Sequence, residues 1–446
     1  MNIVVVGCGY LGAVHAACMA DIGHQVIGVD LDPQKIADLT EGRAPFFEPE
    51  LPELLTRAVA TGRLTFTDPA EVGPLLAALD GPTVWFICVG TPQRAGEFAA
   101  DTTYVEASVT MMQPLLRAGD LVVGKSTVPV GTAGRLAERI ATTQPEAMLA
   151  WNPEFLREGH AVRDTQRPDR LVYGLPADPQ RAGVAKAMLD EVYEDAIGAG
   201  VPVITMDYAT AELVKTAANA FLATKISFIN AMAEVCEAAG ADVAMLAEAI
   251  GHDERIGPKF LGAGLGFGGG CLPKDIRAFM ARAGELGADQ ALTFLREVDA
   301  INMRRRIRMV EIARDVLGGS FMGRKIAVLG AAFKPNSDDI RDSPALNVAA
   351  QIQLQGGRVI VTDPEAIDNA RKVWPQLVFA ATVEDACKDA DVVLLLTEWQ
   401  EYRDIDPAKL GEIVASRHVI DGRNALDPQR WRAAGWSYRA LGRPNA

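Results

Sequence analysis

One cysteine, Cys271, stands in the stretch GFGGGCLPKDI (residues 266–276), after a glycine run and just before Pro-Lys-Asp. Pro273 suits the first turn of a helix, so Cys271 and Asp275, four residues apart, would lie one turn from each other. A thiol at a helix N-terminus with Lys274 nearby is expected to have a lowered pKa and to be a nucleophile. The alternative is a buried structural cysteine beside a glycine loop, which is where most cysteines are found.

Two other pairs of polar side chains have a spacing that could support such chemistry. Lys215 and Asn219 are four residues apart in AELVKTAAN and would share a helix face. They could donate to a developing oxyanion, or the lysine could simply extend along apolar surface to reach water. Glu154 and Glu158 are four apart in NPEFLREG and would share a face if this segment is helical. The alternative is a solvated charge pair.

A glycine motif near the N-terminus points to a dinucleotide. VVVGCGYLG places Gly7, Gly9 and Gly12 in G-x-G-x-x-G spacing directly after an apolar run. Such glycines allow a tight turn and close backbone approach to a pyrophosphate at a helix N-terminus. A second apolar run ends in Asp30, where a carboxylate binds a ribose diol and repels a 2′-phosphate, which favours NAD over NADP. The alternative is a glycine turn without a ligand.

Hydroxyl side chains follow two further apolar runs, FICVGTP and GKSTVPVG. Ligands of doubly wound sheets lie at the carboxyl ends of the strands, so Thr91, Ser126 and Thr127 could face a cofactor or substrate. The alternative is that they are helix caps, which is the more common role of an isolated hydroxyl.

The last third of the chain places cations in loops after predicted strands. Lys334 and Arg341 lie in AAFKPNSDDIRDSP, and Arg423 lies in IDGRN. Each could bind a phosphate, or each could be an ordinary surface charge.

The elements that must position these residues have an α/β pattern. The runs NIVVVG, QVIGVD, TVWFICVG and DLVVGKS read as buried parallel strands. The segments ADLTEG, LPELLTRAVATG and VEASVTMMQPLLRAG read as the helices between them. This alternation predicts a doubly wound sheet.

After this first part the alternation of strands and helices stops. Residues 206–242 are rich in Ala and Leu at helical spacing and predict one long helix, or two joined end to end. The stretch after the cysteine begins with helices. From residue 324 the strand–helix alternation returns in RKIAVLGAAFKPN, GGRVIVTDPEA, ADVVLLLTE and HVIDGRN. We therefore predict an α/β fold of two Rossmann-like doubly wound domains joined by a long central helix, with boundaries at 1–200, 201–315 and 316–446.

Composition narrows the function classes. The chain has 446 residues and a net charge of -14, which argues against nucleic acid as a partner. No apolar run approaches the length of a membrane span, and no basic region precedes the first apolar run, so we expect a cytoplasmic protein. The six cysteines are scattered, and the five histidines show no metal-ligand spacing.

Taken together, these motifs closely resemble the UDP-glucose 6-dehydrogenase family. The shared strings, in the family's order, are GCGYLG, FICVGTP, STVPVGT, NPEFLREG, KTAAN, RIGPKFL, GFGGGCLPKD, FKPNSDDIRDSP, TEWQEY and DGRN. The resemblance implies two oxidations of a sugar C6 alcohol to a carboxylate, with two NAD⁺ consumed. Cys271 would hold the intermediate aldehyde as a thiohemiacetal, which is oxidised to a thioester and hydrolysed.

The same resemblance implies roles for individual residues. Besides Cys271, the catalytic set is Lys215 and Asn219 for the oxyanions, Asp275 with a water and Thr127 for protons, and Glu154 for thioester hydrolysis. The implied NAD contacts are Gly7, Gly9, Tyr10, Leu11, Gly12, Asp30, Lys35, Thr91, Thr127, Glu158, Lys274 and Arg341. The implied sugar-nucleotide contacts are Glu154, Phe155, Leu156, Arg157, Glu158, Lys215, Asn219, Phe260, Leu261, Gly262, Ala263, Gly264, Gly268, Lys334 and Arg423.

The resemblance also implies a homodimer, because Arg255 would reach the substrate of the neighbouring subunit across an interface built on the long helix. Domain 1–200 would bind NAD, and domain 316–446 would bind the nucleotide sugar. TEWQEY and DGRN favour UDP-glucose, while dTDP-glucose, GDP-mannose and UDP-N-acetylhexosamines remain alternatives for the same chemistry. At Gly270 the sequence departs from many relatives, which have serine or tyrosine there.

Two readings from other functional classes stay open. One is a two-electron dehydrogenase that releases an aldehyde or ketone. The other is a non-catalytic sensor of NAD and nucleotide sugars, which the catalytic set argues against because binding alone needs no thiolate.

Overall fold

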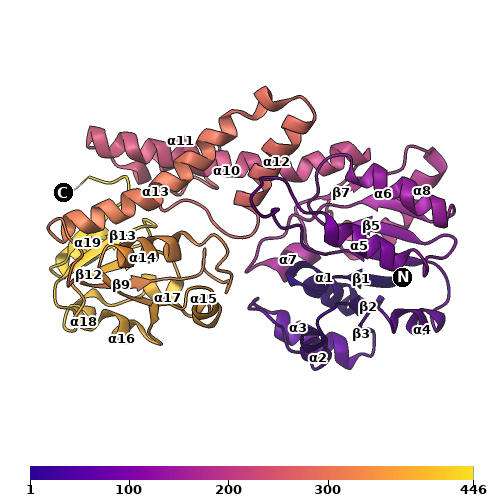
Figure 1. Cartoon of the computed structure of the whole chain (residues 1–446), viewed down its shortest axis with the longest axis horizontal. Helices are drawn as coiled ribbons and strands as arrows, with labels where there is room; N and C mark the ends of the chain where they lie inside the picture. Colours follow the sequence, from indigo (N-terminus) through magenta and orange to yellow (C-terminus); the bar gives the residue numbers. More distant parts are fainter. Residues whose placement is uncertain (445–446) are drawn as a thin grey trace. The chain divides into compact units, whose positions relative to one another are not determined.

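The computed structural model describes residues 1–444 and divides into two compact units. Unit 1 consists of Met1–Ala218 with Arg277–Leu286, and unit 2 consists of Asn219–Ile276 with the chain from Gly287 onward. The domain boundaries predicted above, at 200 and 315, stay a prediction. Each unit is built on its own sheet (Figure 1).

Within the described residues, unit 1 contains an eight-stranded sheet of order β3-β2-β1-β4-β5-β6-β7-β8. Its strands are β1 Asn2–Val6, β2 Gln25–Val29, β3 Leu64–Thr67, β4 Thr83–Ile87, β5 Leu121–Gly124, β6 Met148–Trp151, β7 Leu171–Gly174 and β8 Val203–Met206. Neighbouring strands are parallel except β6 and β7. The four predicted strands, β1, β2, β4 and β5, are confirmed.

Strands β1, β4, β5 and β6 are buried on both faces of the sheet, which explains why they are almost continuously apolar. Along β1, Ile3 and Val5 belong to one core cluster, and Val4 and Val6 belong to another, as the alternation of a strand requires. The surrounding helices are α1 Tyr10–Asp21, α2 Pro33–Thr40, α3 Leu51–Ala60, α4 Val72–Ala77, α5 Thr103–Met112, α6 Thr132–Thr143, α7 Ala161–Gln166, α8 Pro179–Val192 and α9 Glu194–Gly198.

One predicted helix is shorter in the structure than its sequence pattern suggested. The pattern in VEASVTMMQPLLRAG continues to Gly119, but α5 ends at Met112. Pro114 explains the difference, because proline has no N–H to donate to the helix.

The described part of unit 2 contains a six-stranded sheet of order β11-β10-β9-β12-β13-β14, with all neighbours parallel. Its strands are β9 Lys325–Leu329, β10 Arg358–Thr362, β11 Val378–Phe379, β12 Val392–Leu395, β13 His418–Asp421 and β14 Ser437–Ala440. The four strands predicted from residue 324 onward are confirmed as β9, β10, β12 and β13. The prediction of a second doubly wound sheet is therefore correct.

The long predicted helix is a single element, α10 Tyr208–Ala239, which begins in unit 1 and continues in unit 2. It contains neither glycine nor proline, so nothing in its sequence interrupts it until Gly240, whose positive φ of 71° ends it. The other helices that follow are α11 Val243–Gly251, α12 Leu272–Glu285, α13 Phe294–Val316, α14 Pro344–Leu354, α15 Ile367–Val373, α16 Val383–Cys387, α17 Gln400–Arg403, α18 Pro407–Leu410 and α19 Pro428–Ala433, with a short 3₁₀ helix at Asp289–Leu292.

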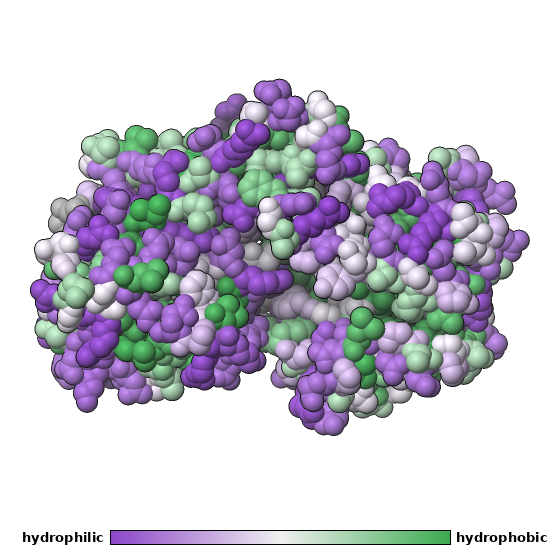
Figure 2. All heavy atoms as spheres, viewed as in Figure 1, coloured by the Kyte–Doolittle hydropathy of each residue, from purple (hydrophilic) through white to green (hydrophobic). Residues whose placement is uncertain are grey.

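On the face drawn in Figure 2, hydrophilic residues predominate and hydrophobic ones occur in separate groups. Among the described helices, none combines the length and the apolar character that crossing a bilayer would need.

The two sheets repeat one turn at equivalent places. After β1, the N–H of Gly7 donates to the carbonyl of the last residue of β2, at 2.8 Å, and the next N–H donates to Asp30 Oδ2, also at 2.8 Å. After β9, the N–H of Gly330 donates to the last residue of β10, at 2.8 Å, and the next N–H donates to Asp363 Oδ2, at 2.7 Å. In each sheet, an aspartate thus holds a glycine turn by a hydrogen bond. Asp30, after β2, holds the turn after β1, and Asp363, after β10, holds the turn after β9.

The surroundings of the two aspartates differ. Asp363 is buried, and its two oxygens also accept the N–H groups of Ala332, Glu365 and Ala366 and the indole N–H of Trp399. Asp30 is instead partly exposed and pairs with the side chain of Lys35. Asp30 thus has fewer fixed donors around it than Asp363, because within the described residues it accepts only the backbone N–H groups of Cys8 and Asp32 besides its pair with Lys35.

Candidate active site

Cys271 lies at the N-terminus of α12. Its carbonyl accepts the N–H of Asp275 at 2.9 Å, which makes Cys271 the cap residue of the helix. Its side chain is exposed, whereas the other five cysteines are buried, and none of the six is in a disulfide. The alternative of a buried structural cysteine is therefore wrong, and the predicted placement of an exposed thiol at a helix N-terminus is correct.

Asp275 is almost fully buried, with 2% of its side chain exposed, yet both of its oxygens are paired. Oδ2 accepts a hydrogen bond from the amide of Asn219 at 2.6 Å, and Oδ1 pairs with the ammonium of Lys274 at 2.5 Å. Three residues expected at the site therefore meet within unit 2, one turn from Cys271. The amide of Asn219, which the sequence analysis paired with Lys215 as an oxyanion donor, donates here to a carboxylate.

The glycine loop before Cys271 is held by a buried asparagine. Asn302 of α13 accepts the N–H of Phe267 at 2.7 Å and donates to the carbonyl of the same residue at 3.0 Å. Gly266 has a φ of 86°, and a Cβ there would lie 2.1 Å from Asn302 Oδ1, so glycine is required. The sequence analysis missed Asn302, because no spacing connects it to the cysteine motif.

The rest of the glycine run packs directly against the loop that carries Arg341. The N–H of Gly269 donates to the carbonyl of Arg341 at 2.8 Å. A Cβ at Gly270 would lie 2.2 Å from Cζ of the Arg341 guanidinium, which itself pairs with Asp339 at 2.6 Å. A serine or tyrosine at Gly270 would therefore need this arginine side chain to move.

Arg423 links several loops of unit 2. Its guanidinium donates to the carbonyls of Leu396, Gly266 and Phe333 at 2.8, 2.9 and 3.2 Å, and it pairs with Glu398 at 3.3 Å. Burial lowers its pKa, although Glu398 opposes this shift. These contacts give Arg423 a role in holding the cysteine loop, and its predicted contact with the substrate stays a prediction.

The remaining predicted substrate residues of unit 2 lie in two places. In the segment 260–264, Phe260 is half-exposed with a φ of 65°, and the N–H of Gly264 donates to Asn230 at 2.9 Å. Leu261 and Ala263 of this segment are buried. Lys334 lies with its ammonium 5.5 Å from the ring of the preceding phenylalanine.

In unit 1, the glycine turn has the form that cradles a dinucleotide. Gly7 has a φ of 90°, and a Cβ at Gly12 would lie 1.9 Å from the carbonyl oxygen of Gly7, so both glycines are required. Helix α1 begins at Tyr10, directly after the turn. Asp30 and Lys35 form an ion pair at 3.0 Å beside it. The turn, the helix N-terminus and the acidic residue together fit the pyrophosphate and ribose of NAD.

Tyr10 connects this turn to the segment 152–159. Its hydroxyl donates to the carboxylate of Glu48, which also accepts the N–H groups of Gly159 at 2.6 Å and Ala161 at 2.7 Å. Glu48 is 2% exposed and comes from APFFEPEL. The sequence analysis missed it, and its one sequence signal is a glutamate between phenylalanine and proline.

The segment NPEFLREG is irregular rather than helical, and α7 begins only at Ala161. Glu154 and Glu158 therefore do not share a helix face. The reason is local, because Glu154 Oε1 accepts the N–H groups of Phe155 at 2.7 Å and Leu156 at 3.0 Å and so folds the chain around its own carboxylate. Arg157 forms an ion pair with Asp164 at 2.7 Å.

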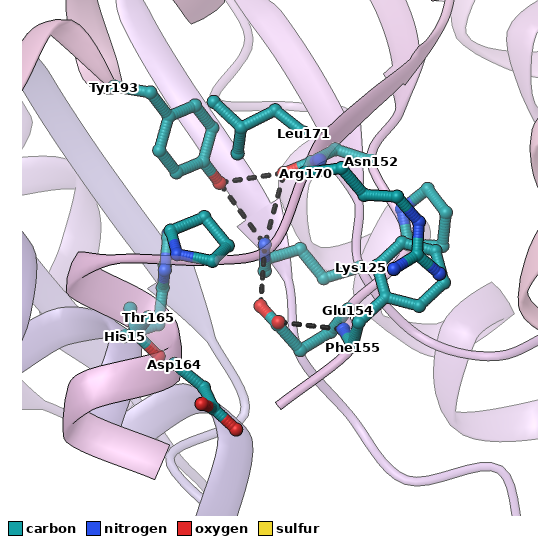
Figure 3. Close-up of a pocket in the computed structure, with 12 residues that line it drawn as sticks. His15, Lys125, Asn152, Glu154, Phe155, Asp164, Thr165, Arg170, Leu171 and Tyr193 are labelled. Carbon is teal, nitrogen blue, oxygen red and sulfur yellow. Dashed lines mark hydrogen bonds and ion pairs between the residues drawn. The ribbon is translucent and has the colours of Figure 1, made fainter. Parts of the chain in front are cut away.

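Figure 3 shows a pocket of unit 1 in which Lys125 lies against Glu154. Lys125 Nζ is 2.9 Å from Glu154 Oε2, 3.0 Å from Asn152 Oδ1 and 3.1 Å from the hydroxyl of Tyr193. The sequence analysis considered the hydroxyls of GKSTVPVG and overlooked this lysine. A lysine directly after a buried strand was the available signal.

Lys215 and Arg170 lie near Phe155. The Lys215 ammonium is 5.4 Å from the centre of the Phe155 ring, and the guanidinium carbon of Arg170 is 4.0 Å from it. Both distances suit cation–π contacts. The segment predicted to bind the sugar thus has two cations next to its aromatic ring.

The strand-end hydroxyls join the loops of unit 1. Thr91 Oγ1 donates to the carbonyl of Thr127 at 2.7 Å, and Ser126 Oγ donates to the carbonyl of Val89 at 2.7 Å. Neither Thr91 nor Ser126 caps a helix, so that alternative is wrong for both of them. Whether these residues touch a cofactor stays a prediction.

Comparison with known sequences gives matches along most of the chain. Profiles of three domains of the UDP-glucose/GDP-mannose dehydrogenase family match: the NAD binding domain at residues 1–197, the central domain at 209–304 and the UDP binding domain at 327–428. A protein of Rhizobium meliloti (strain 1021) called UDP-glucose 6-dehydrogenase is 42% identical over 447 residues, covering 100% of both chains. UDP-glucose 6-dehydrogenase TuaD of Bacillus subtilis (strain 168) is 40% identical, covering 99% of this chain and 93% of that protein.

Solved structures give the same result for the fold. A UDP-glucose dehydrogenase from Pyrobaculum islandicum has a TM-score of 0.87 at 37% identity, over 99% of this chain and 98% of its own. A UDP-D-ManNAc dehydrogenase from Pyrococcus horikoshii has a TM-score of 0.85 at 26% identity, over 100% of both chains. The architecture described above is therefore shared with both proteins.

Proposed function

The chain belongs to the UDP-glucose/GDP-mannose dehydrogenase family, and on that premise we propose that it oxidises C6 of UDP-glucose to the carboxylate, giving UDP-glucuronate and two NADH. Its full-length relatives from Rhizobium meliloti and Bacillus subtilis are called UDP-glucose 6-dehydrogenases, which supports this substrate. The observation that carries the proposal is the exposed thiol of Cys271 at a helix N-terminus, one turn from the buried carboxylate of Asp275.

In the proposed reaction, each residue of the candidate site has a chemical role. A bound NAD would supply the hydride acceptor for the two oxidations at C6. Asp275, with a water and Thr127, takes the proton of the C6 alcohol. Cys271 adds as thiolate to the resulting aldehyde, and the second oxidation turns this thiohemiacetal into a thioester. Lys215 and Asn219 stabilise the negative oxygens, with Asn219 also fixing Asp275 through the hydrogen bond described above. Glu154 assists the attack of water on the thioester.

A direct test measures the stoichiometry with UDP-glucose, dTDP-glucose, GDP-mannose and UDP-N-acetyl sugars at equal concentration. We expect two NADH for each sugar acid, with UDP-glucose as the fastest substrate. One NADH per sugar, with an aldehyde or ketone released, would select the two-electron dehydrogenase instead. Binding without turnover of any of these sugars would select the sensor.

A second candidate substrate is a UDP-N-acetylhexosamine. The observation that favours it is the match to the UDP-D-ManNAc dehydrogenase of Pyrococcus horikoshii, with a TM-score of 0.85. The lower sequence identity, 26% against 42% for the relative from Rhizobium meliloti, places it second. The substrate panel above decides between the two.

The cofactor contact is tested at Asp30. Changing Asp30 to alanine is expected to raise the KM for NAD by about 10- to 100-fold, because a charge-assisted hydrogen bond to the ribose is lost. The preference for NAD over NADP should fall as well, since no carboxylate then repels the 2′-phosphate. The control is Asp38→Ala on α2, which removes an exposed ion pair with Arg43. An unchanged ratio of kcat/KM for the two cofactors would contradict the assignment.

We also propose that the protein is a homodimer built on α10. The support is a row of exposed apolar side chains at seven-residue spacing, Phe221, Phe228 and Val235, which are 66%, 48% and 57% exposed. This spacing keeps the three side chains on one helix face. In this assembly Arg255, whose side chain is 89% exposed, would reach the substrate of the partner. The cytoplasmic location expected from the sequence is part of the same proposal.

The dimer has its own test. Phe228→Asp is expected to give a monomer in analytical ultracentrifugation, because a charge would be buried in the centre of the apolar row. Activity should fall with the loss of the dimer, since Arg255 would then be separated from its substrate. Leu354→Asp, at an 87% exposed position of unit 2 outside this row, is the control. A dimeric Phe228→Asp variant would contradict the interface.

A further inference from the structure

The pocket in Figure 3 gives Glu154 a buried cationic partner to which no role has been assigned so far. Only 3% of the Lys125 side chain is exposed. An ammonium group has three protons to donate, and three oxygens lie within 3.1 Å of it, on Glu154, Asn152 and Tyr193. Lys125 thus has an acceptor for every proton, and its position is fixed by all three.

The partners of Lys125 are anchored in turn. The hydroxyl of Tyr193 donates to Asn152 Oδ1 at 2.6 Å, and the amide of Asn152 donates to the carbonyl of Val172 at 3.0 Å. These contacts tie the end of β5 to β7 and to the end of α8, far from the exposed surface. Lys125 is therefore part of a rigid polar network.

Both carboxylate oxygens of Glu154 have donors. Lys125 takes Oε2, while the N–H groups of Phe155 and Leu156 take Oε1. Each of these donors makes a charge-assisted contact with the carboxylate. The arrangement leaves the carboxylate with one orientation and 15% of its side chain exposed.

The ionisable groups around Glu154 are consistent with a charged Lys125. Burial by itself would lower the pKa of Lys125, but Glu154 more than offsets it, so the pKa lies above the usual lysine value. Burial raises the pKa of Tyr193 to about 12, so this phenol stays neutral and can donate. His15, which lines the same pocket, has a pKa well below its usual value because of burial and of the nearby Lys125. Lys125 therefore keeps its positive charge beside Glu154 near neutral pH.

We propose that Lys125 is a positioning residue for the last chemical step, which holds Glu154 as an oriented carboxylate for thioester hydrolysis and takes no part in hydride transfer. This inference rests on the proposed function. In the step concerned, a water oxygen bonds to the thioester carbon while Glu154 accepts one water proton. The C–S bond then breaks, Cys271 leaves as thiolate, and the new carboxylic acid loses its proton to solvent.

The variant Lys125→Met keeps most of the side-chain volume and removes the charge. We expect a rapid burst of two NADH per active site to persist on mixing with UDP-glucose and NAD, followed by steady-state turnover about 100-fold slower than in the unaltered enzyme. Acid-quenched enzyme should then carry the sugar acyl group on Cys271, detected as intact mass. Lys186→Met, which breaks an exposed lysine–carboxylate pair on α8, is the matched control and should leave both phases unchanged.

Hydroxylamine separates positioning from general damage. It attacks thioesters without help from a base, so it should restore steady-state NADH formation in Lys125→Met and yield the sugar hydroxamate. If the burst and the steady state fall together without rescue, Lys125 is structural and the inference is wrong. If the burst and the steady-state rate of Lys125→Met both equal those of the unaltered enzyme, the inference is also wrong.

A second variant covers the case in which Lys125→Met does not fold. Tyr193→Phe removes one of the three acceptors of Lys125 and keeps the ion pair with Glu154. This variant should keep the burst of NADH and lose several-fold in the steady-state rate of NADH formation. An equal loss in the burst and in the steady-state rate, or no loss in either, would overturn the inference. Failure of the proposed function looks different, because the unaltered enzyme would then form one NADH, or none, for each sugar.

Discussion

Replacing Cys271 with alanine is expected to stop formation of the sugar acid, with steady-state NADH production from UDP-glucose falling by about 10³-fold or more. The thiol is the exposed cysteine of the chain and lies at the N-terminus of α12. Without it, no covalent adduct holds the half-oxidised sugar for the second oxidation. The measurement is NADH and UDP-glucuronate formed per enzyme, followed by mass spectrometry of the quenched protein.

The serine variant refines this result. Cys271→Ser keeps a nucleophilic atom but exchanges a readily ionised thiol for a hydroxyl, so we expect it to be inactive in the steady state or trapped as a stable ester. Binding of NAD and of UDP-glucose, measured by calorimetry, is the control and should be close to that of the unaltered enzyme. Normal acid production by Cys271→Ala would show that the covalent mechanism is wrong.

Changing Asp275 to asparagine is expected to lower kcat by about 10²- to 10³-fold, with little change in the KM for the sugar. The carboxylate is buried between the amide of Asn219 and the ammonium of Lys274. An amide of the same shape fits the space but cannot take a proton, and it leaves Lys274 without its charge partner. The measurement is steady-state kinetics with UDP-glucose varied at saturating NAD.

The matched control for Asp275→Asn lies on the same helix. Glu285→Gln neutralises a carboxylate that is 54% exposed and pairs with Arg282 near the C-terminus of α12. It should leave kcat within about twofold, since exposed pairs contribute little. Equal losses in the two variants would mean that Asp275 acts only by stabilising the helix.

Much of the fold could be predicted because its signals are local. The apolar runs of β1, β4 and β12 read as strands from composition alone, and α10 contains no residue that would interrupt a helix. The cysteine at a helix start was also local, since Pro273 and the glycines lie within a few residues of it. Where a short motif contains all the partners, the sequence is enough.

The parts that could not be predicted depend on contacts between distant residues. Lys125 meets Tyr193 across 68 positions of sequence, and Asn302 meets the glycine loop across 35. Asn219 was paired with Lys215 because helical spacing is visible, whereas its bond to Asp275 spans 56 positions. The shared helix face considered for Glu154 and Glu158 is absent for the opposite reason, because the Glu154 side chain binds the backbone directly after it, which spacing does not reveal.

The repeated turn after β1 and β9 has one more consequence. In the second sheet, Asp363 already receives four backbone N–H groups and an indole N–H, so a sugar diol finds no vacant acceptor there. In the first sheet, Asp30 receives two backbone N–H groups and the ammonium of Lys35, which leaves its oxygens more room for a diol. A ribose diol therefore cannot be bound by Asp363 in the way expected for NAD at Asp30, and a nucleotide bound at the second sheet would have to be recognised through other groups.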